Sequence, residues 1–259
     1  MIFVVGGQGF LGSAFVRRCQ TRGLACVAIT RQNYGEFVGQ ECAVLVNANG
    51  NSRKYIARAD PLWDFDASVR SVRASLREFR AGLYVYLSSV DVYPDSSAPE
   101  MTREDQDLDV ARQTPYGFHK YLAELCVRQA APKWLIVRGG GFVGPDLTKN
   151  AIYDILNGGP LWLDPGSELQ YLHADDAADM VLELARQEIT NEVFNLSARG
   201  VVRLQEVVEL VGREVVVRPG SPRTRCEVSL EKLSRYVPVP ETGPTVARFV
   251  QEALERTRR

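Results

Sequence analysis

The stretch Met1-Ile-Phe-Val-Val-Gly-Gly-Gln-Gly-Phe-Leu-Gly12 decides the fold of this 259-residue chain. Its apolar run at residues 2–5 predicts a buried strand, and Gly6, Gly9 and Gly12 then follow at GxxGxxG spacing. Apolar residues next recur at helical spacing, which predicts a helix directly after the glycines. A strand, a glycine turn and a helix in this order form a dinucleotide-binding corner, because the glycines let the backbone approach a pyrophosphate and the helix N-terminus supplies free N–H groups. A glycine-rich turn without a ligand is the alternative for the motif taken alone.

Composition narrows the class of protein. The chain is 45% hydrophobic and 24% charged, which is typical of a globular protein with one large core, alone or with a small appendage. Its net charge of −1 and the lack of a long basic run argue against nucleic-acid binding. No stretch approaches the roughly 20 apolar residues that span a bilayer, and Met1 leads straight into the first strand. We therefore expect neither a membrane segment nor a signal peptide.

The cysteines and histidines bear on compartment and metal binding. Five scattered cysteines without a CxxC pair are typical of reduced thiols in a cytoplasm. With only two histidines in the chain, we expect no metal site.

The first half alternates strand-like apolar runs with helical patterns, which predicts βαβ units and an α/β, Rossmann-like, doubly wound parallel sheet. Gly23 and Gly82 stand where helix C-caps are expected, and Thr114-Pro115 predicts a helix start with proline at the first helical position. About a dozen residues separate the second and third strands, so we expect a short or irregular connection there. The predicted strands are 2–5, 24–29, 43–47, 83–88 and 134–138, and the predicted helices are 10–22, 66–81 and 116–131.

The second half changes character, because glycine and proline interrupt it often. We expect residues 1–145 to form the dinucleotide-binding domain, and residues 146–259 to complete the sheet and form a small, mostly C-terminal substrate-binding lobe. The helical patterns there are 148–157, 174–187, 203–211 and 244–257, and the strand patterns are 169–173, 192–196 and 214–218.

Three residues carry the predicted chemistry. Tyr116 and Lys120 lie four residues apart at the start of a predicted helix, so they share one face. An ammonium and a helix N-terminus stabilise a phenolate, which predicts a lowered pKa for Tyr116 and a role in proton transfer to or from a substrate oxygen. Ser89 follows an apolar run at the carboxyl end of a strand, where its hydroxyl is expected to hydrogen-bond the same oxygen. A surface pair and an ordinary serine turn are the alternatives.

With these residues in this order, the chain resembles the extended short-chain dehydrogenases/reductases of the NAD-dependent epimerase/dehydratase type, over nearly its whole length. The resemblance is carried by six segments: GGQGFLG at 6–12, SSVDVY at 88–93 (SSxxVYG in the family), YGFHK at 116–120 followed by AE at 123–124, RGGGFVGP at 138–145 (LRxxNVYGP), YLHADD at 171–176 (FIHVDD) and EVFNL at 192–196 (GEVYNV).

The resemblance implies a mechanism in which a hydride passes between a nicotinamide and a substrate carbon while Tyr116 handles the proton on oxygen. Ser89 then orients the carbonyl, and Lys120 also holds the nicotinamide ribose. The implied catalytic residues are Ser89, Tyr116 and Lys120, and the implied cofactor-binding residues are Gly6, Gly9, Phe10, Leu11, Gly12, Thr30, Arg31, Tyr116 and Lys120.

The end of the second predicted strand bears on the choice of cofactor. Ile29-Thr30-Arg31 lacks the acidic residue that binds the adenosine ribose hydroxyls and favours NAD. Arg31 is suited to pair with a 2′-phosphate, so we expect NADP. NAD, with Arg31 as an exposed loop residue, is the alternative.

Departures from the family pattern bear on the substrate. Val90 replaces the first of two acidic residues that follow the catalytic hydroxyl in the family's dehydratases, and only Asp91 remains, which disfavours dehydration. Gly141 and Leu169 replace an asparagine and an arginine that help to hold nucleotide sugars in relatives. A sugar or sugar nucleotide is still the expected substrate, and the expected contacts are Asn49, Arg53, Asp91, Arg138 and Lys149.

The sequence thus predicts a cytoplasmic NAD(P)-dependent oxidoreductase or epimerase that acts on a sugar or sugar nucleotide. By analogy with relatives, the helices at 66–81 and 116–131 are expected to form a homodimer face. A carbonyl reductase of a non-sugar metabolite and a non-catalytic NAD(P)-binding sensor are the alternatives, and the complete set of Ser89, Tyr116 and Lys120 argues against the sensor.

Overall fold

The computed structural model describes residues 1–258, which divide into two compact units. Each unit is assembled from segments that are far apart in the sequence. Unit 1 contains Met1–Pro94, Glu104–Gly139 and Ala178–Asn195, and unit 2 contains Asp95–Arg103, Gly140–Ala177 and the chain from Leu196 onward.

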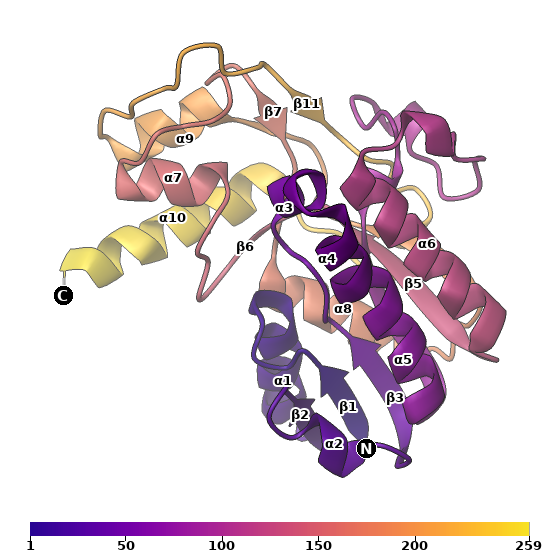
Figure 1. The fold of residues 1–259 in the computed structure, drawn as a ribbon. Helices are drawn as coiled ribbons and strands as arrows, with labels where there is room; N and C mark the ends of the chain where they lie inside the picture. The colour runs from indigo at the N-terminus through magenta and orange to yellow at the C-terminus, as the bar shows by residue number, and fades with distance from the viewer. Residues whose placement is uncertain (259) are drawn as a thin grey trace. The chain divides into compact units, whose positions relative to one another are not determined.

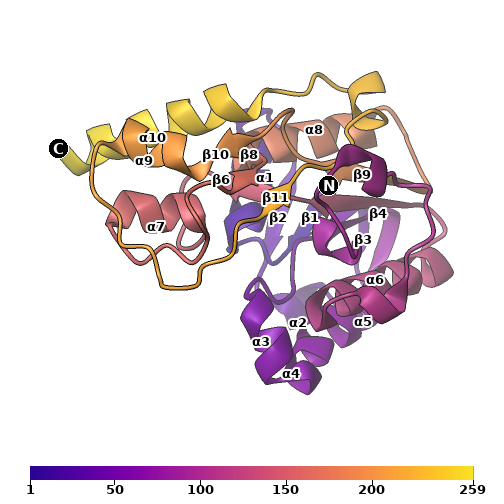
Figure 2. The same cartoon turned by 90° about the horizontal axis from the view of Figure 1, so that it is seen from above.

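Unit 1 is built on a six-stranded sheet with the order β2-β1-β3-β4-β5-β9. Figure 1 labels β1, β2, β3 and β5, and Figure 2 labels β4 and β9. The pairs β1–β2, β1–β3, β3–β4 and β4–β5 are parallel, as the alternation of strands and helices predicts. The strand order reverses between β1 and β3, and ligands of such sheets bind beyond the carboxyl ends of the strands at this point. The strands are β1 (Ile2–Val5), β2 (Cys26–Ile29), β3 (Glu41–Asn47), β4 (Arg80–Ser89), β5 (Trp134–Gly139) and β9 (Glu192–Leu196).

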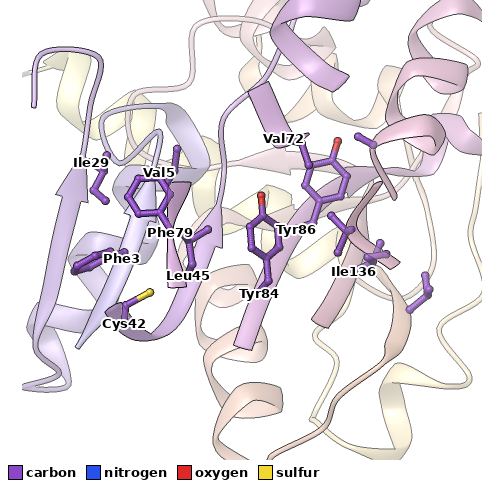
Figure 3. Packing of buried hydrophobic residues seen from close by; sticks show 13 residues of the cluster. Phe3, Val5, Ile29, Cys42, Leu45, Val72, Phe79, Tyr84, Tyr86 and Ile136 are labelled. Atoms are coloured by element: carbon purple, nitrogen blue, oxygen red, sulfur yellow. The ribbon is translucent and has the colours of Figure 1, made fainter. Parts of the chain in front are cut away.

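Two helices, α5 (Ser71–Glu78) and α6 (Pro115–Ala130), cover one face of this sheet (Figure 2). Apolar side chains of both helices share one buried cluster with the sheet residues beneath them, Tyr84 and Tyr86 among these. Figure 3 shows these two rings next to each other, because residues two apart on a strand point to the same face. The helix that carries Tyr116 and Lys120 is therefore fixed to β4 by the core.

The opposite face of the sheet carries α1 (Phe10–Thr21) and α8 (Ala174–Arg186). Arg18 and Arg22, at the end of α1, each form an ion pair of 2.8 Å with Asp179 of α8. These ion pairs join the helix that begins at the glycine corner to its neighbour on the same face.

Unit 2 has its own core around α7 (Ala151–Asn157), α9 (Leu204–Val211) and α10 (Thr242–Arg258). Its short strands form a two-stranded and a three-stranded sheet. They are β6 (Gly141–Val143) with β8 (Tyr171–His173), and β10 (Val202–Arg203) with β7 (Glu168–Leu169) and β11 (Arg225–Cys226). No helix in residues 1–258 combines the length and the apolar character that crossing a bilayer requires.

The structure confirms most predicted elements and corrects three. The helix predicted at 66–81 is wrong at both ends, because α4 (Pro61–Phe65), a π-helical turn and α5 fill residues 61–78 and β4 begins at Arg80. Gly82 lies inside β4 and is not a helix cap: a Cβ there would come within 2.8 Å of the Ala43 carbonyl oxygen on β3. The strand predicted at 214–218 is reduced to one bridge between Val217 and Leu161.

Two further connections complete unit 1. The link between β2 and β3 contains only the single-turn helix α2 (Tyr34–Phe37), as its length predicts. The short helix α3 (Lys54–Ala59), between β3 and α4, was not predicted, since its six residues are too few for a clear apolar period.

Candidate active site

The glycine corner has no space for side chains. Gly6 has a φ of +79°, in the left-handed region that favours glycine. A Cβ at Gly12 would lie 2.1 Å from the Gly6 carbonyl oxygen, and a Cβ at Gly9 would lie 3.2 Å from the same atom. Gly9 caps α1 without a side-chain hydrogen bond, and the half-buried Phe10 and Leu11 open the helix. This close-packed turn at a helix N-terminus fits the pyrophosphate of the predicted dinucleotide.

The turn after β2 is held by Asn33. Its Oδ1 accepts hydrogen bonds from the Thr30 amide at 2.7 Å and the Thr30 hydroxyl at 3.2 Å, and its Nδ2 donates to the Ala28 carbonyl at 3.1 Å. Arg31 extends from this turn and is exposed at the carboxyl end of β2. Because Arg31 is exposed at the end of the strand, its guanidinium is accessible to an anion.

Ser89 and Asp91 form a hydrogen-bonded pair at the carboxyl end of β4. The Ser89 hydroxyl donates to Asp91 Oδ2 at 2.7 Å and accepts from the Asp91 amide at 3.2 Å. Lys54, from α3, contacts both carboxylate oxygens of Asp91, at 2.6 and 2.7 Å. Asp91 therefore lies against the predicted catalytic hydroxyl and is balanced by a lysine.

Gly117 allows α6 to approach this turn. A Cβ at Gly117 would lie 1.9 Å from the Asp91 carbonyl oxygen, so any side chain would push the helix away from Ser89. The Thr114 hydroxyl accepts from the Gly117 amide at 3.1 Å, and Pro115 takes the first helical position, as predicted. This cap fixes where α6 begins and hence where Tyr116 lies.

The pKa of Tyr116 differs from the sequence prediction. Burial, followed by the charges of Asp91 and Asp64, raises it above the ordinary value, whereas hydrogen bonding to Ser89 lowers it. The expected lowering was wrong because it took account of the neighbouring ammonium and the helix N-terminus but not of burial, and the Tyr116 side chain is buried. At neutral pH Tyr116 therefore retains its proton.

Lys120 is buried one helical turn after Tyr116. Its ammonium donates to the Leu87 carbonyl at 3.0 Å and lies 5.1 Å from the centre of the Tyr86 ring. Burial lowers the pKa of Lys120 to about 8, against the opposing charges of Asp64, Glu124 and Asp91. A buried ammonium that titrates near neutral pH is typical of a functional site.

Residues 49–50, which follow β3 after Ala48, connect Lys120 with the glycine corner. A Cβ at Gly6 would lie 3.0 Å from the Asn49 amide nitrogen, and a Cβ at Gly50 would lie 3.5 Å from Lys120 Nζ. The corner and the Tyr116–Lys120 helix thus converge on the same two residues, and Asn49 lies next to the dinucleotide corner.

The other predicted substrate contacts do not gather there. Arg53 is exposed before α3, and Lys149 is exposed in unit 2 before α7. Arg138 is buried: its Nε and Nη2 donate to Glu124 at 3.0 and 2.8 Å, and its Nη1 donates to the Tyr93 hydroxyl at 2.8 Å. All these donors are directed at protein groups, so the geometry favours a structural role for Arg138 over the predicted substrate contact.

The sequence did not reveal the buried carboxylate of Asp64. Asp64 of α4 lies 2.6 Å from the Nδ1 atom of His119 and is completely buried. Its position is separated from His119 by 55 residues, and no local pattern links the two. The one available signal was the position of His119 immediately before Lys120 in a chain with two histidines.

Comparisons with known proteins agree with this fold. The model of the NAD dependent epimerase/dehydratase family matches residues 2–197. The chain belongs to this family. No curated protein sequence matches it at a significant level.

Several solved structures share the fold. A UDP-glucose 4-epimerase from the hyperthermophilic eubacterium Thermotoga maritima, solved with UDP-glucose, has a TM-score of 0.76 at 17% identity, with 100% of this chain and 99% of that chain covered. RMD from Pseudomonas aeruginosa, complexed with NADPH, has a TM-score of 0.81 at 18% identity, with 98% and 99% covered. MoeE5 in complex with UDP-glucuronic acid and NAD has a TM-score of 0.80 at 16% identity, with 99% of each chain covered.

Proposed function

We propose that this chain is an NAD(P)-dependent reductase or epimerase that acts on a sugar or sugar nucleotide through Ser89, Tyr116 and Lys120. The observation that carries the proposal is the convergence of the glycine corner and Lys120 on residues 49–50. It favours an enzyme over a nucleotide-binding sensor, because a sensor does not need a buried lysine beside a tyrosine and a serine.

Each of the three residues has a distinct role in this proposal. Tyr116, whose raised pKa keeps it protonated, donates a proton to a substrate carbonyl and takes one from a hydroxyl in the reverse direction. The ammonium of Lys120 stabilises the phenolate left behind by that transfer. Ser89, held by Asp91, orients the substrate oxygen. A bound nicotinamide supplies the hydride acceptor or donor.

The residues around the corner are suited to hold the dinucleotide. The N–H groups at the start of α1 and the glycine backbone receive the pyrophosphate, and Lys120 holds the nicotinamide ribose. The exposed Arg31 at the end of β2 supports NADP, since its guanidinium suits a 2′-phosphate. Related structures contain either NADPH or NAD, so NAD is the alternative for this chain.

The substrate class is inferred from relatives that bind UDP-glucose or UDP-glucuronic acid. Val90 stands where dehydration needs an acid, so reduction or epimerisation is favoured over loss of water. Asn49 and Asp91, both in unit 1, are the proposed substrate contacts, with the exposed Arg53 as a further one.

A carbonyl reductase of a non-sugar metabolite is the second candidate, and Gly141 favours it. Relatives use an asparagine at this position to hold the nucleotide sugar. A Cβ at Gly141 would lie 2.6 Å from the Gln170 carbonyl oxygen, so this backbone does not admit that asparagine. The nucleotide part of a sugar substrate would have to be held by other residues.

One experiment separates these reactions. The protein is incubated with NADPH and a keto-sugar nucleotide, and separately with NAD and UDP-glucose, while nicotinamide absorbance and product NMR are followed. Stoichiometric loss of NADPH indicates a reductase, and a changed sugar without net loss of cofactor indicates an epimerase. Turnover of a simple ketone with no sugar nucleotide converted would favour the second candidate. Loss of water would contradict the interpretation of Val90.

A further inference from the structure

Asp64 is a buried carboxylate that the proposed mechanism does not use. It is completely buried on α4, in unit 1. Its Oδ2 lies 2.6 Å from His119 Nδ1, and its Oδ1 accepts from Asn51 Nδ2 at 2.7 Å and from the Ser68 hydroxyl at 3.4 Å. Because a carboxylate only accepts hydrogen bonds, the Nδ1 atom of His119 is the donor. A buried charge is costly unless a cation is close.

The nearby cation is Lys120. It follows His119 directly on α6, the helix that packs on α4. A Cβ at Gly50 would lie 3.5 Å from Lys120 Nζ and 3.9 Å from the Ser68 hydroxyl, which donates to Asp64. The Lys120 ammonium and the Ser68 hydroxyl that is bonded to Asp64 therefore both lie close to Gly50.

Lys120 needs a counter-charge, since the backbone of β4 and the Tyr86 ring enclose it. Three carboxylates oppose the lowering of the Lys120 pKa: Asp64 from α4, Glu124 from α6 and Asp91 after β4. Asp64 has the largest effect of the three. The buried Tyr86 and Tyr116 face the same region.

These three carboxylates differ in their own partners. Glu124 is hydrogen-bonded to Arg138, and Asp91 is ion-paired with Lys54. Asp64 is hydrogen-bonded to His119, Asn51 and Ser68, so its charge is not already matched by an arginine or a second lysine in these contacts.

We propose that Asp64, oriented by His119, is a positioning residue that keeps Lys120 charged and thereby sets the alkaline limit of cofactor binding and turnover. The inference rests on the proposed function for the link to cofactor, but its electrostatic part concerns the apoprotein alone. The ring centroids of Phe65 and Phe118 lie 5.7 and 6.0 Å from the centroid of the His119 imidazole.

The direct test is the titration of the Lys120 ammonium by NMR in protein labelled with 15N-lysine. The chain has five lysines, and Lys120→Arg assigns the signal. Asp64→Asn keeps the shape but removes the charge, so the titration midpoint should fall by about 1 pH unit or more. Asp60→Asn is the matched control: it removes an exposed carboxylate at the N-cap of the same helix, where asparagine caps equally well, and should leave the midpoint unchanged.

Cofactor affinity gives a second readout that a purely structural role would not move. If the midpoint falls from about 8 to about 7, the charged fraction of Lys120 at pH 8 falls about fivefold, and NADPH affinity should fall by a similar factor. At pH 6 both proteins carry a charged lysine, so the affinities should agree. Asp64→Glu restores the carboxylate and should restore the pH profile.

The outcomes are separable. An unmoved Lys120 midpoint in Asp64→Asn overturns the inference, as does an equal loss of NADPH affinity at pH 6 and pH 8. If Asp64→Asn does not fold, Asp64→Ser removes the same charge with less volume and is judged by the same titration. Failure of the wild-type protein to bind NADPH or NADH would contradict the proposed function, while the lysine titration would still decide the effect of Asp64 on Lys120.

Discussion

Arg138→Met distinguishes a structural arginine from a substrate-binding one. The guanidinium makes two hydrogen bonds to Glu124 and one to Tyr93, and both members of the ion pair are buried. Methionine has a similar length, so the main effect is to leave Glu124 charged and buried with the Ser88 hydroxyl as its remaining partner. Removing one partner of a buried pair costs about 3–5 kcal/mol, a large part of the roughly 5–15 kcal/mol that stabilises a domain.

The assay is urea denaturation followed by tryptophan fluorescence. With an m value of about 2 kcal/mol per molar urea, the midpoint should fall by about 2 M. Arg138→Met combined with Glu124→Leu buries no charge and should recover most of the stability. A loss below about 1 kcal/mol, or weaker substrate binding in an equally stable variant, would refute this reasoning.

Three further predictions concern the cofactor site and Lys120. Gly12→Ala should abolish dinucleotide binding in calorimetry, because its Cβ would lie 2.1 Å from the Gly6 carbonyl oxygen. The control Gly35→Ala, which has open space at its Cβ, should bind normally. Retained binding in Gly12→Ala would contradict the geometry of the glycine corner. Arg31→Ala should weaken NADPH binding about tenfold or more and leave NADH binding unchanged, since a charge-assisted hydrogen bond contributes about 1.5–3 kcal/mol. Equal effects on both cofactors would show that Arg31 does not bind the 2′-phosphate. Burial lowers the pKa of Lys120 from 10.5 to about 8, so between these pH values the unfolded chain binds more protons and stability should rise with pH. Lys120→Met should flatten that rise in urea denaturation, and an unchanged slope would contradict it.

Local signals account for the parts of the fold that the sequence predicts well. The corner at 1–12 combines an apolar strand with glycines whose spacing is set by the backbone contact between Gly12 and Gly6. Thr114 and Pro115 mark the start of α6 through a cap and a fixed φ, which are properties of the residues themselves. Tyr116 and Lys120 could be placed on one face because helical spacing determines it.

Other features depend on contacts between distant segments. Gly82 looks like a helix cap in sequence, but the close approach of Ala43 on the neighbouring strand determines its role. The pairing of Asp64 with His119 arises only when α4 packs on α6. The burial that raises the pKa of Tyr116 also depends on tertiary packing. The burial of Arg138 similarly requires Glu124 and Tyr93 to meet across β5, and no local pattern encodes that.

The most direct test of the central claim is turnover by Tyr116→Phe, measured beside NADPH binding by the same protein. The variant keeps the ring in its buried place and deletes the hydroxyl alone. Proton transfer by a positioned side chain contributes about 10²–10⁴-fold to rate, so turnover of the substrate found for the wild-type protein should fall by about that factor while NADPH binds with unchanged affinity. Turnover near the wild-type rate would contradict the assignment of Tyr116, and with it the proposed Ser89–Tyr116–Lys120 site.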